Sequence, residues 1–415
     1  MSAFTFVFLA TLCIATLTRL WLGERHVRHV QAHRDRVPTG FADQITLAAH
    51  QKAADYTSAK TRLNLLRVVL DAAVLLALTL GGVLNALDEL WRAALGPGLW
   101  AGVALIVSAV LILSIIDLPV SWYRTFRIES RFGFNQMTLG LFATDLLKQA
   151  LVAAVVGGPL LIAVLWLMQA MGERWWLYVW LVWVGFSVLM LVVYPSFIAP
   201  LFNKFSPMQE GDLKSRIEAL LAKCGFRSQG LFVMDGSKRS SHGNAYFTGF
   251  GRAKRIVFFD TLLSRLDPPE IEAVLAHELG HFTLRHVIKR MALTFGVSLV
   301  FLWALGQLMD QQWFFQGLGV STASTSMALL LFFLVMPVFT FLFQPVASFY
   351  SRKHEFEADA YAARQSSAAD LAHALVKLYK DNASTLTPDP LHSAFYDSHP
   401  PAAARIARLQ QTAPA

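Results

Sequence analysis

The sequence predicts an α-helical membrane protein with one small α+β element between its fifth and sixth spans. Of its 415 residues, 55% are hydrophobic and only 15% are charged. The mean hydropathy of +0.46 is too high for an ordinary soluble enzyme. Seven apolar runs are long enough to cross a bilayer, and the main polar stretch between them, about 198–290, contains the motif His277-Glu278-Leu279-Gly280-His281.

Seven apolar runs form the predicted spans. They cover residues 4–22, 65–86, 99–116, 148–171, 175–194, 291–309 and 326–349. The first run has no basic residue before it and no small-residue cleavage site after it. This pattern favours a retained span over a cleaved signal peptide.

Lysines and arginines are concentrated after spans one, three, five and seven, whereas the segments after spans two, four and six hold one arginine or none. The positive-inside rule then places the N-terminus outside and the larger loops in the cytoplasm. The net charge of +8 is spread over these loops without interleaved aromatic residues, which favours membrane topology over nucleic-acid binding. We therefore expect a lipid bilayer, and no nucleic acid, as a partner.

Ionisable residues inside the predicted spans indicate a polar cavity among the helices. They are Arg19, Asp71 and Lys148, with Asp145 at the start of the fourth span. Such groups are costly in lipid unless they face protein or water. An alternative for Arg19 and Lys148 is that they extend to the membrane surface. The two cysteines lie in unlike segments, which argues against a disulfide framework or a cysteine-ligated metal.

The motif at 277–281 predicts a helix that binds one zinc ion. Asp267-Pro268-Pro269-Glu270 supplies the N-cap, prolines in the first turn and a capping-box glutamate. His277 and His281 are four residues apart and share a helix face, while Glu278 projects towards an open coordination position. This arrangement predicts metal-assisted hydrolysis with Glu278 as general base, and a chance pattern is the alternative.

A β-hairpin is predicted immediately before this helix. An amphipathic helix and a strand at 231–234 come first, and the hairpin strands follow at 244–250 and 255–259, joined by a glycine-rich turn that ends at Lys254. In many zinc peptidases such a strand pairs with an extended substrate. The candidate substrate-binding residues are Asn244, Ala245, Tyr246 and Phe247; an ordinary core hairpin is the alternative.

A catalytic zinc ion needs a third protein ligand, and the helical stretch after the seventh span offers one. Glu355 and Asp359 are four residues apart on one face. We assign Glu355 to the metal and Asp359 to a hydrogen bond with a zinc-bound histidine. Glu357 then faces solvent. His354 is the rival ligand, although it is rotated off that face.

These motifs resemble the Ste24 family of integral-membrane zinc metalloproteases, the type I CaaX prenyl proteases. Besides the two metal-binding motifs, the matching stretches are 242–246, 127–138, 200–205 and 397–401, so the resemblance extends from about residue 62 to 409. It implies a barrel of seven spans around a large chamber, a small zincin-like α+β metalloprotease element and a helical C-terminal segment. The corresponding boundaries are 1–197, 198–290, 291–350 and 351–415.

The resemblance also implies roles for particular residues. His277, His281 and Glu355 hold zinc at the cytoplasmic side of the chamber, and Glu278 is the base. His399 matches a family position close to the substrate, where a donor stabilises the oxyanion; a loop histidine without a role is the alternative. His242, His286 and His392 are interpreted as packing or surface residues.

The predicted function is zinc-dependent hydrolysis of peptide bonds. The resemblance implies removal of the last three residues of a prenylated Cys-a-a-X peptide. A quality-control protease of membrane proteins, without a prenyl requirement, is an alternative, and a zinc-stabilised transporter is a remote one. The alanine- and arginine-rich composition favours a bacterial inner membrane, with the endoplasmic reticulum membrane expected for a eukaryotic source.

Overall fold

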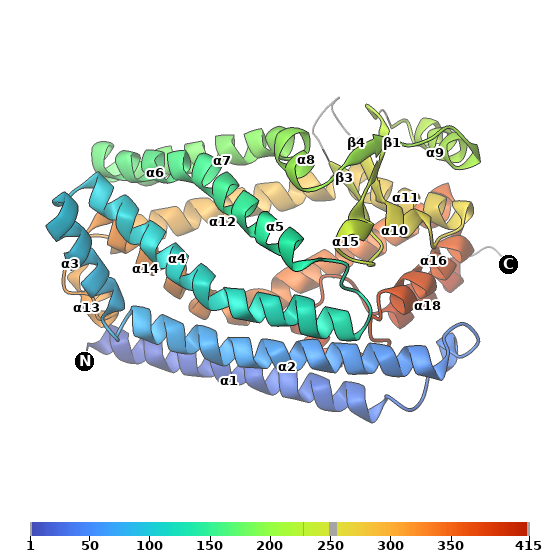
Figure 1. Ribbon diagram of the computed structural model, residues 1–415, viewed down its shortest axis with the longest axis horizontal. Helices are drawn as coiled ribbons and strands as arrows, with labels where there is room; N and C mark the ends of the chain where they lie inside the picture. Colours follow the sequence, from blue (N-terminus) through green and yellow to red (C-terminus); the bar gives the residue numbers. More distant parts are fainter. Residues whose placement is uncertain (1, 227, 249–254, 413–415) are drawn as a thin grey trace.

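A computed structural model describes residues 2–226, 228–248 and 255–412 of the chain. The membrane helices lie along the long axis of the molecule, and the sheet with its surrounding helices lies at the end opposite the N-terminus (Figure 1). The predicted glycine-rich turn at 249–254 lies outside the described residues.

Long apolar helices make up most of the chain. Within the described residues, six are long and apolar enough to span a membrane, and a seventh span results if the bent pair α2 (Leu47–Leu78) and α3 (Val83–Leu95) is counted as one. The others are α1 (Ala3–Ala32), α4 (Leu99–Tyr123) extended by η2 (Arg124–Glu129), α5 (Leu139–Val152) joined through η3 (Ala153–Gly157) to α6 (Gly158–Ala170), α7 (Trp175–Val193) extended by η5 (Tyr194–Ile198), α12 (His286–Leu308), and α14 (Thr325–Thr340) with α15 (Gln344–Gln365). The prediction of a multi-pass helical membrane protein is confirmed.

The second predicted span, 65–86, differs from the structure because it crosses a break. Helix α2 begins at Leu47, well before the apolar run, and ends before a Gly81-Gly82 pair. Gly82 has φ +80°, a conformation that glycine adopts without steric cost. The chain therefore bends by 48° between α2 and α3.

The seventh span continues directly into the segment that carries Glu355. Helices α14 and α15 are separated only by the short turn η7 (Phe341–Phe343), and Pro345 lies in the first turn of α15. The predicted boundary at 350/351 therefore falls inside α15. As a result, Glu355 stands on a helix that is continuous with a membrane helix.

The α+β element contains a four-stranded sheet in the order β1-β2-β4-β3. Its strands are β1 (Phe205–Pro207), β2 (Leu231–Met234), β3 (Ala245–Thr248) and β4 (Arg255–Phe259). Strands β2 and β4 are parallel, while β1 and β3 pair antiparallel with their neighbours. The predicted antiparallel pairing of β3 with β4 is confirmed, and β3 is one of the two edge strands among the described residues, the other being β1. Asn244 lies just before β3, where its carbonyl accepts a hydrogen bond from Phe259 N–H.

Helices around this sheet form a second hydrophobic core, separate from the core of the membrane helices. Apolar residues from α9 (Asp212–Lys223), β4 and α11 (Pro268–Thr283) are buried in it, including Ile217, Phe258 and Leu275. The remaining elements are η1 (Thr39–Phe41), η4 (Gly172–Arg174), α8 (Ala199–Phe202), η6 (Gly236–Lys238), α10 (Asp260–Leu263), α13 (Gln312–Gly317), α16 (Ala368–Asp381), α17 (Pro390–Tyr396) and α18 (Ala402–Thr412).

Three cavities form a series from the membrane helices to the α+β element. The first, about 350 Å³, is lined by α1, α2, α4 and α14 and includes Arg19 and Asp71, as the sequence predicts. It shares Arg67 with a second cavity of about 300 Å³. The second shares Tyr396 with a third of about 280 Å³, which reaches His399.

The other two ionisable residues near the spans are bonded elsewhere. Lys148 donates to the Leu201 carbonyl at 2.6 Å. Asp145 is buried and accepts two hydrogen bonds from Arg239, at 2.7 and 2.8 Å. Neither of these residues lines the three cavities, because the chain after the fifth span folds back over the start of α5 and provides their partners.

Candidate metal centre

The start of helix α11 is determined by local capping. The Asp267 side chain accepts from the backbone of the first turn, and the Glu270 carboxylate accepts from Asp267 N–H at 2.8 Å. Lys377 on α16 donates to both carboxylates, at 2.7 and 2.8 Å. This predicted capping box is confirmed, and it fixes the phase of the helix that presents His277.

Glycine at position 280 allows α11 to approach α15 closely. A Cβ atom there would lie only 3.0 Å from the Ala358 Cα and 3.1 Å from the Tyr361 Cβ. Gly280 of α11 and Ala358 of α15 are both small where the helices meet, so the two backbones pack closely against each other. This contact brings His277 and His281 against the face of α15 that carries Glu355.

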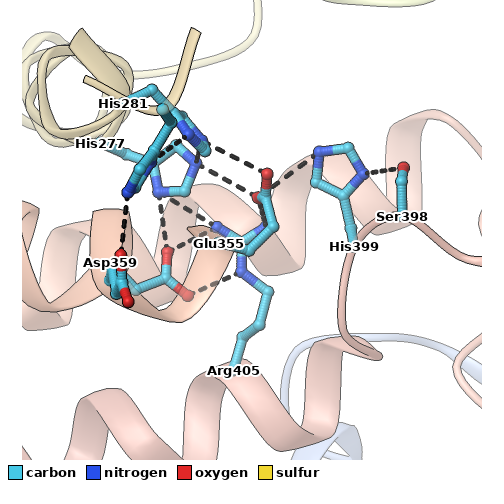
Figure 2. A network of polar contacts seen from close by, with 9 residues as sticks. His277, His281, Glu355, Asp359, Ser398, His399 and Arg405 are labelled. Atoms are coloured by element: carbon cyan, nitrogen blue, oxygen red, sulfur yellow. Dashed lines mark hydrogen bonds and ion pairs between the residues drawn. The ribbon is translucent and has the colours of Figure 1, made fainter. Parts of the chain in front are cut away.

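Three side chains converge between the two helices (Figure 2). The Nε2 atoms of His277 and His281 are 3.2 Å apart. One Glu355 oxygen lies 3.4 Å from His277 Nε2, and the other lies 3.3 Å from His281 Nε2. His277 and Glu355 are buried, and His281 is partly buried. The structure brings together these three residues, the trio that the sequence predicts.

The spacing of the convergent atoms matches metal coordination better than it matches direct hydrogen bonds between the three side chains. A tetrahedral ion with bonds of about 2.0–2.1 Å has ligand atoms about 3.3 Å apart, which is the spacing seen here. Glu355 Oε2 is buried without a hydrogen-bond partner among the described residues. Two imidazole nitrogens and a carboxylate oxygen therefore face one point, and a cation at that point would compensate the buried carboxylate.

Asp359 and Arg405 orient His277. Asp359 Oδ1 is 2.8 Å from His277 Nδ1, so the carboxylate accepts the Nδ1–H, and Nε2 is the ring nitrogen directed at Glu355. Arg405 on α18 donates two hydrogen bonds to Asp359, at 2.8 and 2.6 Å. Burial alone would lower the pKa of His277, but the hydrogen bonds to Asp359 and Glu355 and the charge of Asp359 together outweigh it and raise the pKa to about 9. The surroundings of the His277 ring thus favour a positive charge there.

His281 is oriented by two residues that the sequence analysis assigned differently. Its Nδ1 lies 3.0 Å from His286 Nδ1, and His286 Nε2 lies 2.9 Å from Glu357 Oε2. Glu357 accepts the Nε2–H of His286, whose Nδ1 then accepts the Nδ1–H of His281. Glu357, predicted to face solvent, is partly exposed but its carboxylate is bonded to His286. His286, interpreted from sequence as a packing or surface residue, is buried and also links Glu357 to His281, because α12 begins at His286 beside α15.

His354, the rival ligand in the sequence analysis, is turned away from the three ligand atoms. Its ring stacks on the His286 ring with centroids 4.0 Å apart and planes 8° apart. Although His286, His354 and Glu357 are close enough to hold a metal, stacked rings do not direct their in-plane lone pairs at one point. We therefore interpret this group as support for His281.

Glu278 and His399 both lie close to the convergent trio. Glu278 forms no hydrogen bond or ion pair with any residue that the structure describes, and burial raises its pKa above the ordinary range. His399 Nε2 is 3.5 Å from Glu355 Oε2, and its Nδ1 is 3.0 Å from Ser398 Oγ (Figure 2). Both residues that the sequence predicts for catalysis therefore adjoin the trio.

The segment before β3 is held by residues from the membrane helices. His242 stacks on Phe134 at 4.3 Å, and its Nε2 lies 3.6 Å from Glu129 and 3.4 Å from the Tyr56 hydroxyl. Asn382 accepts from Gly243 N–H at 3.2 Å. His242, interpreted from sequence as packing or surface, thus anchors the chain immediately before the edge strand.

Comparison with known proteins agrees with this architecture. Residues 26–204 match the family described as "CAAX prenyl protease N-terminal, five membrane helices", and residues 207–413 match "Peptidase family M48". CAAX prenyl protease 1 of Saccharomyces cerevisiae is 32% identical over 403 residues, covering 90% of this chain and 88% of the relative. This chain belongs to the CAAX prenyl protease 1 family of M48 peptidases.

Other members of the family show the same agreement. The "CAAX prenyl protease 1 homolog" of Caenorhabditis elegans is 32% identical over 430 residues, covering 96% of each chain. The crystal structure of S. mikatae Ste24p has a TM-score of 0.90 and 29% identity, and covers 99% of each chain. The chain is therefore a multi-pass membrane metalloendopeptidase with the Ste24 fold.

Arg405 and His286 are the functional candidates that sequence reasoning missed. Arg405 lies 46 residues after Asp359 in an amphipathic terminal helix, so no spacing links the two. His286 follows His281 by five residues, which was the available signal. Helical spacing does not connect the two residues, because the helix ends between them, at Leu284 and Arg285.

Proposed function

We propose that this chain is a zinc-dependent endopeptidase that removes the last three residues of prenylated Cys-a-a-X peptides. The observation that carries the proposal is the convergence of His277, His281 and Glu355 beside Glu278, at one end of a series of cavities. The names of the relatives, CAAX prenyl protease 1, support the substrate class. A peptide or protein substrate follows from membership of a peptidase family.

The proposed zinc ligands are His277, His281 and Glu355. Two imidazole nitrogens and one carboxylate oxygen, with a further position open, are a donor set typical of catalytic zinc. A bound zinc ion supplies Lewis acidity that polarises the scissile carbonyl and makes water acidic near neutral pH. Asp359 and His286 keep the Nε2 atoms of the two histidines free to bind it.

Glu278 is the proposed general base. Its carboxylate has no partner in the described part of the chain, so it is free to accept a proton from water and pass that proton to the leaving amine. Burial raises its pKa towards the working range, because the charged form loses solvation. A carboxylate with this raised pKa is suited to both halves of the transfer.

His399 is the proposed donor to the oxyanion. With the Ser398 hydroxyl donating to Nδ1, the proton of the neutral ring is on Nε2. That nitrogen is the one directed at Glu355, 3.5 Å from Oε2. A carbonyl oxygen placed beside this nitrogen would receive the N–H as negative charge develops.

The edge strand is the proposed substrate-binding element. Backbone groups of Asn244, Ala245, Tyr246 and Phe247 are offered on the side of β3 that has no partner strand among the described residues. An extended peptide pairing there would be held by main-chain hydrogen bonds, which tolerate varied side chains. His242 fixes the entry to this strand through Glu129 and Tyr56.

The site is proposed to lie on the cytoplasmic side of the membrane. The α+β element is at the end of the molecule opposite the N-terminus, together with the basic segments that follow the odd-numbered spans (Figure 1). The positive-inside rule supports a cytoplasmic position for that end. A bacterial inner membrane is the proposed location, on composition alone.

The decisive experiment compares a farnesylated Cys-a-a-X peptide with its unprenylated twin, using the full chain purified in detergent. Cleavage of the farnesylated peptide alone, abolished by a chelator and by Glu278→Gln, is the expected result. Glu278→Gln should retain the metal, since Glu278 is not a ligand. Full activity in Glu278→Gln would contradict the assignment of the base.

A quality-control protease without a prenyl requirement is the second candidate. Four charged residues, Arg19, Arg67, Asp71 and Asp117, stand in the otherwise mostly apolar lining of the first cavity, which could therefore admit polar polypeptide as well as a hydrocarbon chain. Equal cleavage of both peptides would support this second candidate. Cleavage of neither by metal-loaded protein would reject both candidates.

A further inference from the structure

The second cavity of the series has a basic lining. It measures about 300 Å³ and is lined by Lys60, Thr61, Leu63, Asn64, Arg67, Val120, Arg124, His392 and Tyr396. Three of these nine residues carry a permanent positive charge, and none carries a carboxylate. Such a lining attracts an anionic group.

The charges of this lining are only partly neutralised. Arg67 forms a 2.8 Å ion pair with Asp117, which lines the neighbouring cavity, and Arg124 is 3.9 Å from Glu129. Lys60 has no carboxylate within ion-pair distance among the described residues. Its ammonium group lies 4.3 Å from the centre of the Tyr56 ring. Lys60 is therefore the cation most available to a ligand.

The cavity is a short peptide's length from the metal centre. Tyr396 lines both this cavity and the next one, which reaches His399. Tyr396 and His399 are three residues apart, and His399 Nε2 lies 3.5 Å from Glu355 Oε2. Three extended residues span about 10 Å at most, so a bound tripeptide is long enough to cover this stretch of chain.

The direction of a bound peptide agrees with this placement. A peptide that pairs antiparallel with β3 has its C-terminal residues beside the start of that strand. His242 lies there, with its Nε2 3.4 Å from the Tyr56 hydroxyl. Lys60 follows Tyr56 by one helical turn on α2, and Asn64 follows by another, so the three share one face.

We propose that Lys60, assisted by Asn64 and Arg124, binds the C-terminal carboxylate of the peptide substrate. This inference rests on the proposed function. When Lys60 holds the C-terminal carboxylate, the distance from Lys60 to the metal centre determines which peptide bond reaches the site of hydrolysis. It thereby selects cleavage three residues from the end.

The test compares a farnesylated Cys-a-a-X peptide as the free acid with the same peptide as the C-terminal amide. The wild-type chain should hydrolyse the acid with a kcat/KM about 10- to 100-fold higher, the range for a hydrogen bond to a charged group. The difference should be mainly in KM, because the carboxylate is remote from the reacting carbonyl.

Lys60→Met should reduce this acid-to-amide ratio to about one, while hydrolysis of the amide stays near the wild-type rate and so reports a folded enzyme. Lys60→Arg should restore most of the preference. Arg62→Met is the matched control: it removes a charge from the same helix at an exposed position outside the cavity lining, and it should keep the wild-type ratio.

Equal hydrolysis of acid and amide by the wild-type chain would overturn the subsite. So would an unchanged preference in Lys60→Met that still hydrolyses the amide. If the metal-loaded wild-type chain hydrolyses neither peptide, the proposed function itself fails, and the subsite fails with it.

Discussion

Single residues around His277 determine whether its Nε2 can bind a metal. Asp359 accepts the Nδ1–H, and Arg405 holds both oxygens of Asp359 in a buried position. A charged acceptor makes the imidazole a stronger ligand than a neutral one would. Arg405 of α18, Asp359 of α15 and His277 of α11 therefore form one hydrogen-bonded chain that orients His277 Nε2.

Replacing Asp359 by asparagine should weaken metal binding about 10- to 100-fold. The amide keeps an oxygen for Arg405 and a similar shape, so loss of charge is the main change. Metal affinity, measured by competition with a chromogenic chelator, reports the effect. Glu272→Gln, which alters a surface carboxylate of the same helix, should leave the affinity unchanged. An affinity equal to wild type in Asp359→Asn would refute the role of this carboxylate.

At the scale of elements, the contact between α11 and α15 builds the centre. Neither helix holds three ligands by itself, and the distance between them is set by the small residues Gly280 and Ala358. Longer side chains at this crossing would move Glu355 away from the two histidines.

Gly280→Ala should therefore lower metal affinity and peptidase activity by about tenfold or more. Alanine favours a helix by about 1 kcal/mol, but overpacking at a contact of this kind costs about 1–3 kcal/mol. Gly296→Ala is the matched control, since a Cβ on Gly296 of α12 meets no atom within 4 Å. A Gly280→Ala enzyme with wild-type metal content and activity would contradict the packing argument.

The contact between α17 and α1 should make the stability of the folded chain depend on pH in the acidic range. His392 stacks on His26 with centroids 3.9 Å apart, and burial lowers the pKa of His392 to about 3. An unfolded chain takes up this proton below about pH 6.5, whereas the folded chain resists it until near pH 3. Stability should fall progressively as pH falls between those values.

His392→Phe retains an aromatic ring but cannot be protonated. Its unfolding midpoint in detergent should decline less than that of the wild type between pH 6.5 and 4, while the two should be similar near pH 8. Parallel decline of both proteins would show that His392 does not contribute to the acid sensitivity.

At the scale of the whole molecule, the α+β element is tied to the membrane helices by buried polar contacts. Arg239, beside η6, forms two hydrogen bonds with Asp145 of α5 and one, at 2.8 Å, with Asn203. The Glu129 and Phe134 contacts to His242 form a second tie. The edge strand is therefore positioned by the membrane part of the fold as well as by its own sheet.

Arg239→Met should destabilise the fold by about 3 kcal/mol, because Asp145 would be left buried without its partner. Denaturant unfolding in detergent micelles provides the measurement. The double variant Arg239→Met with Asp145→Leu should recover much of the loss, since no buried charge then remains unpaired. A loss in the double variant as large as in the single one would contradict this explanation.

Much of this architecture is determined by local sequence. Apolar runs of about 20 residues predict spans without reference to neighbours, because lipid requires each span to satisfy its own backbone. The capping box at Asp267, the four-residue spacing of His277 and His281, and the hairpin before them are equally local. For Glu355, spacing and family resemblance together indicated the position.

Other features were decided only by the tertiary structure. The break at Gly82, the bonding of Asp145 to Arg239, the Glu357–His286–His281 chain and the Arg405–Asp359 pair join segments with no common spacing or motif. Their partners are chosen by how α11, α12, α15 and α18 pack, and packing depends on shape complementarity between surfaces far apart in sequence. The convergent trio and its partner Asp359 could therefore be predicted from spacing and family resemblance, whereas Arg405, His286 and Glu357, which orient the two histidines of the trio, could not.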